Sequence, residues 1–215
     1  KNFAAYYVDF MSSSNAKNIM LEGASGFGKT FLCETWLIDF YAQHYGIMIN
    51  DIKGNEFSAF TRACGGISVD LTYSSTYYVN TFVWRVQDVG HLDYKQYADK
   101  MSNLSKQMLM ILCNFNDPDD VSSCEALIDS FLQAMYSLCG VLAENPNTWE
   151  RTEQLNPFVV FDYFERWLSY EIREKYGRVA TKALDRLRVF ISRSGSNSHM
   201  FRTPIVYSDI LNSPV

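Results

Sequence analysis

The stretch NIMLEGASGFGKTF, residues 18–31, decides the fold and the chemistry that this sequence predicts. Its second half fits the pattern G-x-x-x-x-G-K-[ST]. Because the pattern alone has false positives, the flanking residues have to support it. Residues 18–21 predict a short buried strand before the loop, and residues 30–45 predict a helix after it. A phosphate-binding loop joins a strand to a helix in this order, so pattern and context agree.

The helix after the loop is predicted from the spacing of its apolar residues. Leu32, Trp36 and Phe40 recur at steps of four, which places them on one face of a helix. Gly46 stands where helices commonly end on a glycine. The sequence therefore predicts one amphipathic helix between the loop and Gly46.

The loop residues have separate tasks in holding a polyphosphate. Glycines let the backbone wrap closely round phosphates with its N–H groups inward, and the helix N-terminus adds a partial positive charge. Lys29 can reach the β- and γ-phosphates, and the Thr30 hydroxyl can bind the metal. The predicted cofactors are therefore ATP and Mg²⁺. The predicted nucleotide-binding residues are Gly23, Ser25, Gly26, Phe27, Gly28, Lys29 and Thr30.

Strands and helices are predicted to alternate after the loop. Residues 47–51 and 67–72 each predict a strand, and residues 57–64 predict a short helix between them. This alternation is typical of a parallel sheet covered by helices, so the expected fold class is α/β.

Beyond residue 92 the pattern becomes helical. Apolar residues follow helical spacing over most of residues 94–192, with breaks at Pro118 and Pro146. We therefore expect three parts: the first part of a nucleotide-binding core at 1–90, an all-helical subdomain at 91–194, and a return to the core at 195–215.

A site that hydrolyses a nucleotide also needs an acidic residue near Mg²⁺, and Asp162 is one candidate. It follows four apolar residues that a strand would bury. However, Asn156 and Pro157 are a favoured N-cap and first residue of a helix, and apolar residues follow at steps of four up to Gly177. We therefore favour one helix over 156–177, which keeps Asp162 away from a strand end.

Two other acids, Asp51 and Glu56, stand at the end of the predicted second strand. For Glu56 alone, a solvated turn is an equally good interpretation. The predicted catalytic residues are Lys29, Asp51 and Glu56, with Thr30 as the metal ligand.

Charge and cysteine content exclude some classes of protein. The chain has 19 Lys and Arg against 24 Asp and Glu, a formal net charge of −5, which excludes a strongly basic protein that coats nucleic acid. Five cysteines without a CxxC pair indicate reduced thiols in a cytosolic protein.

Basic residues gather near the end of the chain, over residues 173–202. A solvated, charged helix face is the usual explanation. Two functional alternatives stay open: contact with nucleic acid, or an arginine that completes the site of a neighbouring subunit, with Arg193 and Arg202 as candidates.

Four stretches together resemble the ATPase domain of the large conjugation ATPases, the TraC/TrbE-type motors of type IV secretion and relatives of the FtsK/HerA translocases. This resemblance implies a RecA-like P-loop core with a mostly parallel sheet, interrupted by an all-helical subdomain. It also implies a homo-hexamer at the cytoplasmic face of the bacterial inner membrane, which works with other secretion components and couples ATP hydrolysis to substrate transfer or pilus assembly. The stretches are NIMLEGASGFGKTF (18–31), IMINDIKGNE (47–56), ACGGISVDLTYSSTYYVNTF (63–82) and SGSNSHMFRTP (194–204).

In that family the acid associated with Mg²⁺ stands on a strand after the loop that residues 194–204 match. Here Asp209 follows a short apolar run and the sequence ends at Val215. The resemblance thus implies that this acid lies beyond residue 215, and that this piece binds ATP but hydrolyses it poorly. The alternatives are a small P-loop kinase of a nucleotide or metabolite, active at this length, and a binding module with a degenerate site.

Overall fold

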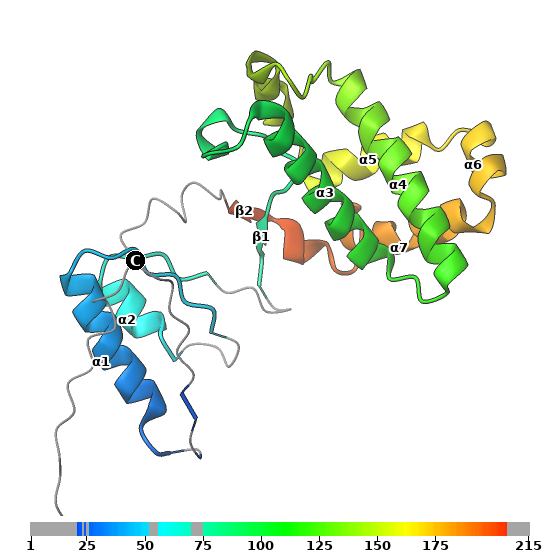
Figure 1. Ribbon diagram of the computed structural model, residues 1–215. Helices are drawn as coiled ribbons and strands as arrows, with labels where there is room; N and C mark the ends of the chain where they lie inside the picture. The colour runs from blue at the N-terminus through cyan, green and yellow to red at the C-terminus, as the bar shows by residue number, and fades with distance from the viewer. Residues whose placement is uncertain (1–20, 23, 25, 52–55, 70–74, 206–215) are drawn as a thin grey trace, which may run out of the picture. The chain divides into compact units, whose positions relative to one another are not determined.

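The computed structural model describes residues 21–22, 24, 26–51, 56–69 and 75–205 (Figure 1). Helices make up 61% of these residues, and the strands among them are β1 (Tyr77–Val79) and β2 (Thr203–Ile205). The chain divides into two compact units, the first unit with residues 1–66 and 214–215 and the second unit with residues 67–213. The boundaries expected from the sequence were residues 90 and 194.

The predicted RecA-like core with a mostly parallel sheet is wrong. The sheet in the described part of the chain is a single parallel pair, in which Tyr77 lies opposite Thr203 and Val79 opposite Ile205. This pair joins two segments far apart in the sequence, but it is three residues long on each side. The described fold is therefore mostly helical.

The strands predicted before residue 73 are not formed where the structure describes them. Residues 47–51 are irregular, and Met48 is 82% exposed. Residues 67–69 are irregular as well, whereas 18–20 and 70–72 lie outside the described residues. An apolar run predicts burial, but a strand also needs a neighbouring strand to complete its hydrogen bonds.

The first unit contains α1 (Lys29–Ala42) and α2 (Ser58–Ala63), which confirm the two helices predicted there. The predicted end of the first helix at Gly46 is wrong, because α1 stops at Ala42 and His44 takes the left-handed conformation, with φ 61°. The Tyr41 hydroxyl donates to the Cys64 carbonyl at 3.1 Å, which connects the end of α1 to the end of α2.

The second unit holds five helices in its described residues. Helix α7 packs against each of the other four, and α3 and α4 lie side by side (Figure 1). Two of these helices start at polar N-caps: Asp93 and Gln96 make a reciprocal capping box, and Asp117 caps the helix that starts at Pro118. The helices are α3 (Tyr94–Cys113), α4 (Pro118–Leu138), α5 (Pro157–Trp167), α6 (Tyr170–Tyr176) and α7 (Arg178–Ile191), with short 3-10 turns η1 (Val86–Asp88), η2 (Pro146–Thr152) and η3 (Ser198–Phe201).

Aromatic side chains fill the core of the second unit. Trp149 stacks on Tyr97 with ring centroids 5.3 Å apart and meets Trp84 edge-on at 5.8 Å. Phe131 and Phe164 pack edge to face at 5.0 Å between α4 and α5. Such geometries add to the stabilisation that comes from burying large apolar surfaces.

The segment 156–177 is helical, but it is two helices and not one. The Asn156 side chain accepts hydrogen bonds from two backbone N–H groups, which confirms the predicted N-cap, and Asp162 lies on α5. The helix stops at Trp167 because Leu168 leaves the helical conformation. The Leu168 carbonyl accepts a hydrogen bond from the Arg173 guanidinium at 3.1 Å. The prediction of a continuous helix is therefore wrong at this break.

No helix in the described segments has the length and apolar character needed to cross a bilayer.

Candidate functional site

The candidate site is the loop that leads into α1. Its described residues include Gly26 and Gly28, with φ 82° and 80°. A Cβ added at either glycine would meet nothing within 4 Å, so both glycines are needed for their left-handed backbone and not for close packing. Two more predicted loop residues, Gly23 and Ser25, lie outside the described residues.

The N-terminus of α1 starts directly at the end of this loop. Gly28 is its N-cap and offers no side-chain acceptor, and the first turn contains no acidic residue. The first intrahelical bond runs from the Leu32 N–H to the Gly28 carbonyl at 2.9 Å. A 14-residue helix that begins without a side-chain cap or an acid directs its first N–H groups and its partial positive charge to the loop, which suits an anion.

Lys29 folds back across the loop. Its Nζ donates to the Ala24 carbonyl at 2.6 Å, and the Phe27 N–H points to the same carbonyl at 3.4 Å. Lys29 is half-buried, whereas Phe27 is 83% exposed. The amine therefore stays close to the loop backbone, and the Phe27 ring turns outward to solvent.

The structure brings Thr30 together with both predicted acids of the first unit. The Thr30 hydroxyl donates to Glu56 Oε2 at 3.3 Å, although the residues are 26 positions apart in sequence. The Glu56 backbone N–H donates to Asp51 Oδ2 at 2.8 Å. A predicted metal ligand and two predicted acids thus form one chain of hydrogen bonds.

The oxygen atoms of Thr30 and Glu56 are of the kind that Mg²⁺ prefers, so these residues fit a nucleotide bound with Mg²⁺. A hydroxyl and a carboxylate are hard oxygen ligands, and Mg²⁺ is commonly held by one or two carboxylates together with substrate phosphates. Among the described residues no three His, Cys, Asp or Glu side chains gather into a metal site. Binding of Mg²⁺ here would thus depend on phosphate oxygens in addition to the Thr30 hydroxyl, beside which Glu56 lies.

The other candidates from the sequence lie in the second unit. Asp162, on α5, is 3.9 Å from Arg193, and both side chains are substantially exposed. Arg202 directly follows η3 and is exposed. Asp162, a candidate acid for Mg²⁺, thus lies beside Arg193, a candidate arginine for the site of a neighbouring subunit.

Sequence spacing missed a pair of buried thiols. Cys113 and Cys124 are both fully buried, one on α3 and one on α4, and the two thiols interact. The neighbouring Cys124 thiol, followed by burial, raises the pKa of the Cys113 thiol, and Cys113 in turn lowers the pKa of Cys124. The two cysteines are eleven residues apart, so a search for CxxC does not find them. Their positions on two consecutive predicted helices, which a short loop joins, could have indicated that they meet.

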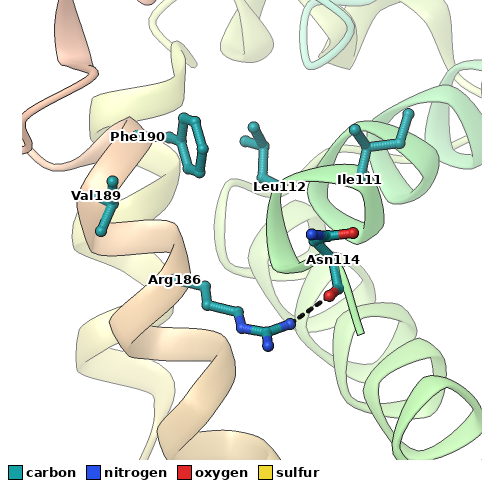
Figure 2. A pocket seen from close by; sticks show the side chains of 6 residues that line it. All are labelled: Ile111, Leu112, Asn114, Arg186, Val189 and Phe190. Atoms are coloured by element: carbon teal, nitrogen blue, oxygen red, sulfur yellow. Dashed lines mark hydrogen bonds between the residues drawn. The ribbon is translucent and has the colours of Figure 1, made fainter. Parts of the chain in front are cut away.

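Close to these thiols, the ends of α3 and α7 form an open groove of about 300 Å³ (Figure 2). Arg186 donates to the carbonyls of Cys113 and Asn114, which closes the exposed end of α3. Asn114 takes the left-handed conformation there, with φ 47°. The arginine is thus part of a helix cap. The lining residues are Ile111, Leu112, Asn114, Arg186, Val189 and Phe190.

Comparison of the chain with protein-family models, with curated proteins and with solved structures found no match.

Proposed function

We propose that the first unit binds ATP with Mg²⁺ through the loop of residues 23–30, as the nucleotide-binding part of an ATPase of the conjugation or type IV secretion kind. One observation carries the proposal: two glycines in left-handed conformation lead directly into a helix with no side-chain cap, and Lys29 folds over the same loop. A polyphosphate suits this arrangement, since it offers backbone N–H groups, a helix dipole and an ammonium group to one anion.

The residues of the loop divide the work. Lys29 would exchange the Ala24 carbonyl for phosphate oxygens, a stronger partner because both groups are charged. Thr30 would offer its hydroxyl oxygen to the metal. Bound Mg²⁺ would supply positive charge that offsets the negative charge of the phosphates.

The wider part of the proposal follows the resemblance of the four stretches. In that setting the chain would work as a homo-hexamer with other components of the transfer machine, at the cytoplasmic face of a bacterial inner membrane. Coupling of ATP hydrolysis to substrate transfer or pilus assembly would be the activity of the whole protein.

Calorimetric titration of the chain with Mg·ATP tests the proposal. Wild type should bind, and Lys29→Ala should weaken binding by about 10–100-fold, the equivalent of one charge-assisted hydrogen bond of roughly 1.5–3 kcal/mol. Lys95→Ala is the matched control, since it removes the same charge from an exposed lysine of the second unit. Equal affinities of wild type and Lys29→Ala, or no binding by wild type, would contradict the proposal.

A further inference from the structure

We infer that the two acids of the first unit have different tasks in the proposed site: Glu56 orients the Thr30 hydroxyl for the metal, and Asp51 is a positioning residue that holds Glu56. The inference rests on the proposed function. It concerns only how the Mg²⁺ side of the site is built from residues of this chain.

The Thr30–Glu56 hydrogen bond sets the direction of the hydroxyl. Thr30 is the second residue of α1, so the helix fixes its backbone. An ionised carboxylate only accepts hydrogen bonds, so Thr30 must be the donor in its 3.3 Å contact with Glu56. With its hydrogen directed to Glu56, the hydroxyl oxygen keeps its lone pairs for a cation, which is the orientation that a metal ligand needs.

Asp51 acts on the backbone of Glu56 and not on Thr30. Its Oδ2 accepts the Glu56 N–H at 2.8 Å, a charge-assisted bond that is among the stronger hydrogen bonds in proteins. The bond fixes the main chain at residue 56, two residues before α2 begins. Asp51 is half-buried whereas Glu56 is exposed, which agrees with a supporting role for the first acid and a role toward a ligand for the second.

The task of Lys29 is separable from that of these acids. Lys29 bonds to the Ala24 carbonyl within the loop, whereas Glu56 bonds to the hydroxyl of Thr30. Loss of Lys29 should weaken nucleotide binding with or without metal. Loss of Glu56 should change the dependence of binding on Mg²⁺ and leave binding without metal intact.

The experiment measures the affinity of the chain for ATP at a series of Mg²⁺ concentrations, starting in excess EDTA. Glu56→Gln removes the charge and the acceptor-only character of the side chain. It should raise the Mg²⁺ concentration that gives half of the increase in ATP affinity by about 10–100-fold, the usual cost of losing a group that orients a metal ligand. The metal-free affinity should stay at the wild-type level. Glu56→Asp keeps the charge and should recover part of the loss.

Asp51 is tested in the same titration. Asp51→Asn keeps a carbonyl oxygen that can accept the Glu56 N–H, so its Mg²⁺ dependence should stay close to wild type. Asp51→Ala removes the acceptor and should shift the Mg²⁺ dependence in the same direction as Glu56→Gln, by less. Glu34→Gln, elsewhere on α1, controls for the loss of one negative charge. Circular dichroism of each variant establishes that the total helix content is retained.

The outcomes separate the inference from the proposed function. If wild type binds no ATP at any Mg²⁺ concentration, the proposed function fails. If wild type binds and Glu56→Gln keeps the wild-type Mg²⁺ dependence, the function stands and the inference is overturned. Equal weakening of the Glu56→Gln complex with and without Mg²⁺ would also overturn it. Wild-type behaviour of Asp51→Ala would overturn the positioning role of Asp51.

Discussion

Arg193 Nη2 lies 3.9 Å from Asp162 Oδ2, a contact between α5 and the residues that follow α7. From the sequence, Asp162 is a candidate acid near Mg²⁺, and Arg193 is a candidate arginine for the site of a neighbouring subunit. In the structure both belong to the second unit, with side chains 76% and 42% exposed. An ion pair of this exposure contributes at most about 1 kcal/mol to folding. This contact is therefore an ordinary ion pair on the surface of the second unit.

We therefore expect Arg193→Ala and Asp162→Asn to be mild changes. Each variant should unfold within about 1 kcal/mol of wild type in urea, since the ion pair is screened by solvent. Each should also bind Mg·ATP as wild type does in calorimetry. A loss of affinity comparable to that of Lys29→Ala would instead show that the second unit contributes to the nucleotide site.

Gly195 is predicted to be intolerant of any side chain. A Cβ at this position would lie 2.5 Å from the Val189 carbonyl oxygen and would also meet the carbonyl of Arg188. These are backbone atoms of the last turns of α7, so they cannot move without disturbing the helix end. Gly195→Ala should therefore lower the free energy of unfolding by about 1–3 kcal/mol, the usual range for overpacking.

Urea unfolding measures this effect, with Ser196→Ala as the matched control. Ser196 is exposed in the same loop, and its change should stay within about 0.5 kcal/mol of wild type. Wild-type stability of Gly195→Ala would contradict the close approach of this loop to α7.

The helices of this protein could be predicted because their signals are local. Asn156 with Pro157, and Asp117 with Pro118, start helices through hydrogen bonds to N–H groups two or three residues away. The break after Trp167 escaped prediction because the apolar spacing continues across it. Ser169 could have indicated the break, since it stands at the N-cap position of α6.

The strands could not be predicted in the same way, because their partners are distant. Tyr77–Val79 pairs with Thr203–Ile205, more than 120 residues away, and three residues are too few to show an alternating pattern. The apolar run at 47–51 looked like a buried strand but has no strand partner in the described part of the chain. The helix predicted to start at Thr30 does start at the end of the loop, one residue earlier at Lys29, since that signal is local as well.

Asp120 should make the stability of the second unit depend on pH. The hydrogen bond from Arg178, at 2.8 Å, holds the pKa of this carboxyl below its usual value, and Lys182 adds to the effect. A carboxyl with a lowered pKa in the folded state stabilises the fold above its unfolded pKa of about 3.9. This contribution is lost as the pH falls through the folded pKa.

The measurement compares thermal unfolding of wild type and Asp120→Asn from pH 7 down to pH 2. The difference in unfolding temperature between wild type and Asp120→Asn should be largest near neutral pH and should shrink below about pH 4. Asp119→Asn, an exposed neighbour in the same first turn, controls for the interaction with the helix dipole. A difference that is constant over the whole range would exclude the ion pair as its cause.

The five cysteines should react in two groups. Cys33, Cys64 and Cys139 are half-buried, whereas Cys113 and Cys124 are fully buried. Reagents in solution do not reach a fully buried thiol, and at Cys113 the raised pKa also disfavours the reactive thiolate. Iodoacetamide should therefore modify the first three in the native protein and the last two only after unfolding. Mass spectrometry of digested samples reads the positions, and early modification of Cys113 would contradict the packing of α3 against α4.

The Thr152 hydroxyl should be worth more to stability than its methyl group. Thr152 is fully buried; its hydroxyl donates to the Trp149 carbonyl at 2.7 Å and accepts the Trp84 backbone N–H at 2.9 Å. Thr152→Val keeps the shape but leaves a buried N–H and a carbonyl without this partner, which costs about 1–3 kcal/mol. Thr152→Ser keeps both bonds and loses one methyl group, which costs about 0.8 kcal/mol by transfer.

Urea unfolding followed by tryptophan fluorescence should thus place the serine variant above the valine variant in stability. The fluorescence is a direct reporter, because Trp84 and Trp149 are the two residues that the hydroxyl connects, and their rings meet at 5.8 Å. A valine variant as stable as the serine variant would mean that the two backbone groups find other partners when the hydroxyl is removed. In that case the hydroxyl does not hold η2 to the segment before α3, and the aromatic core alone fixes it.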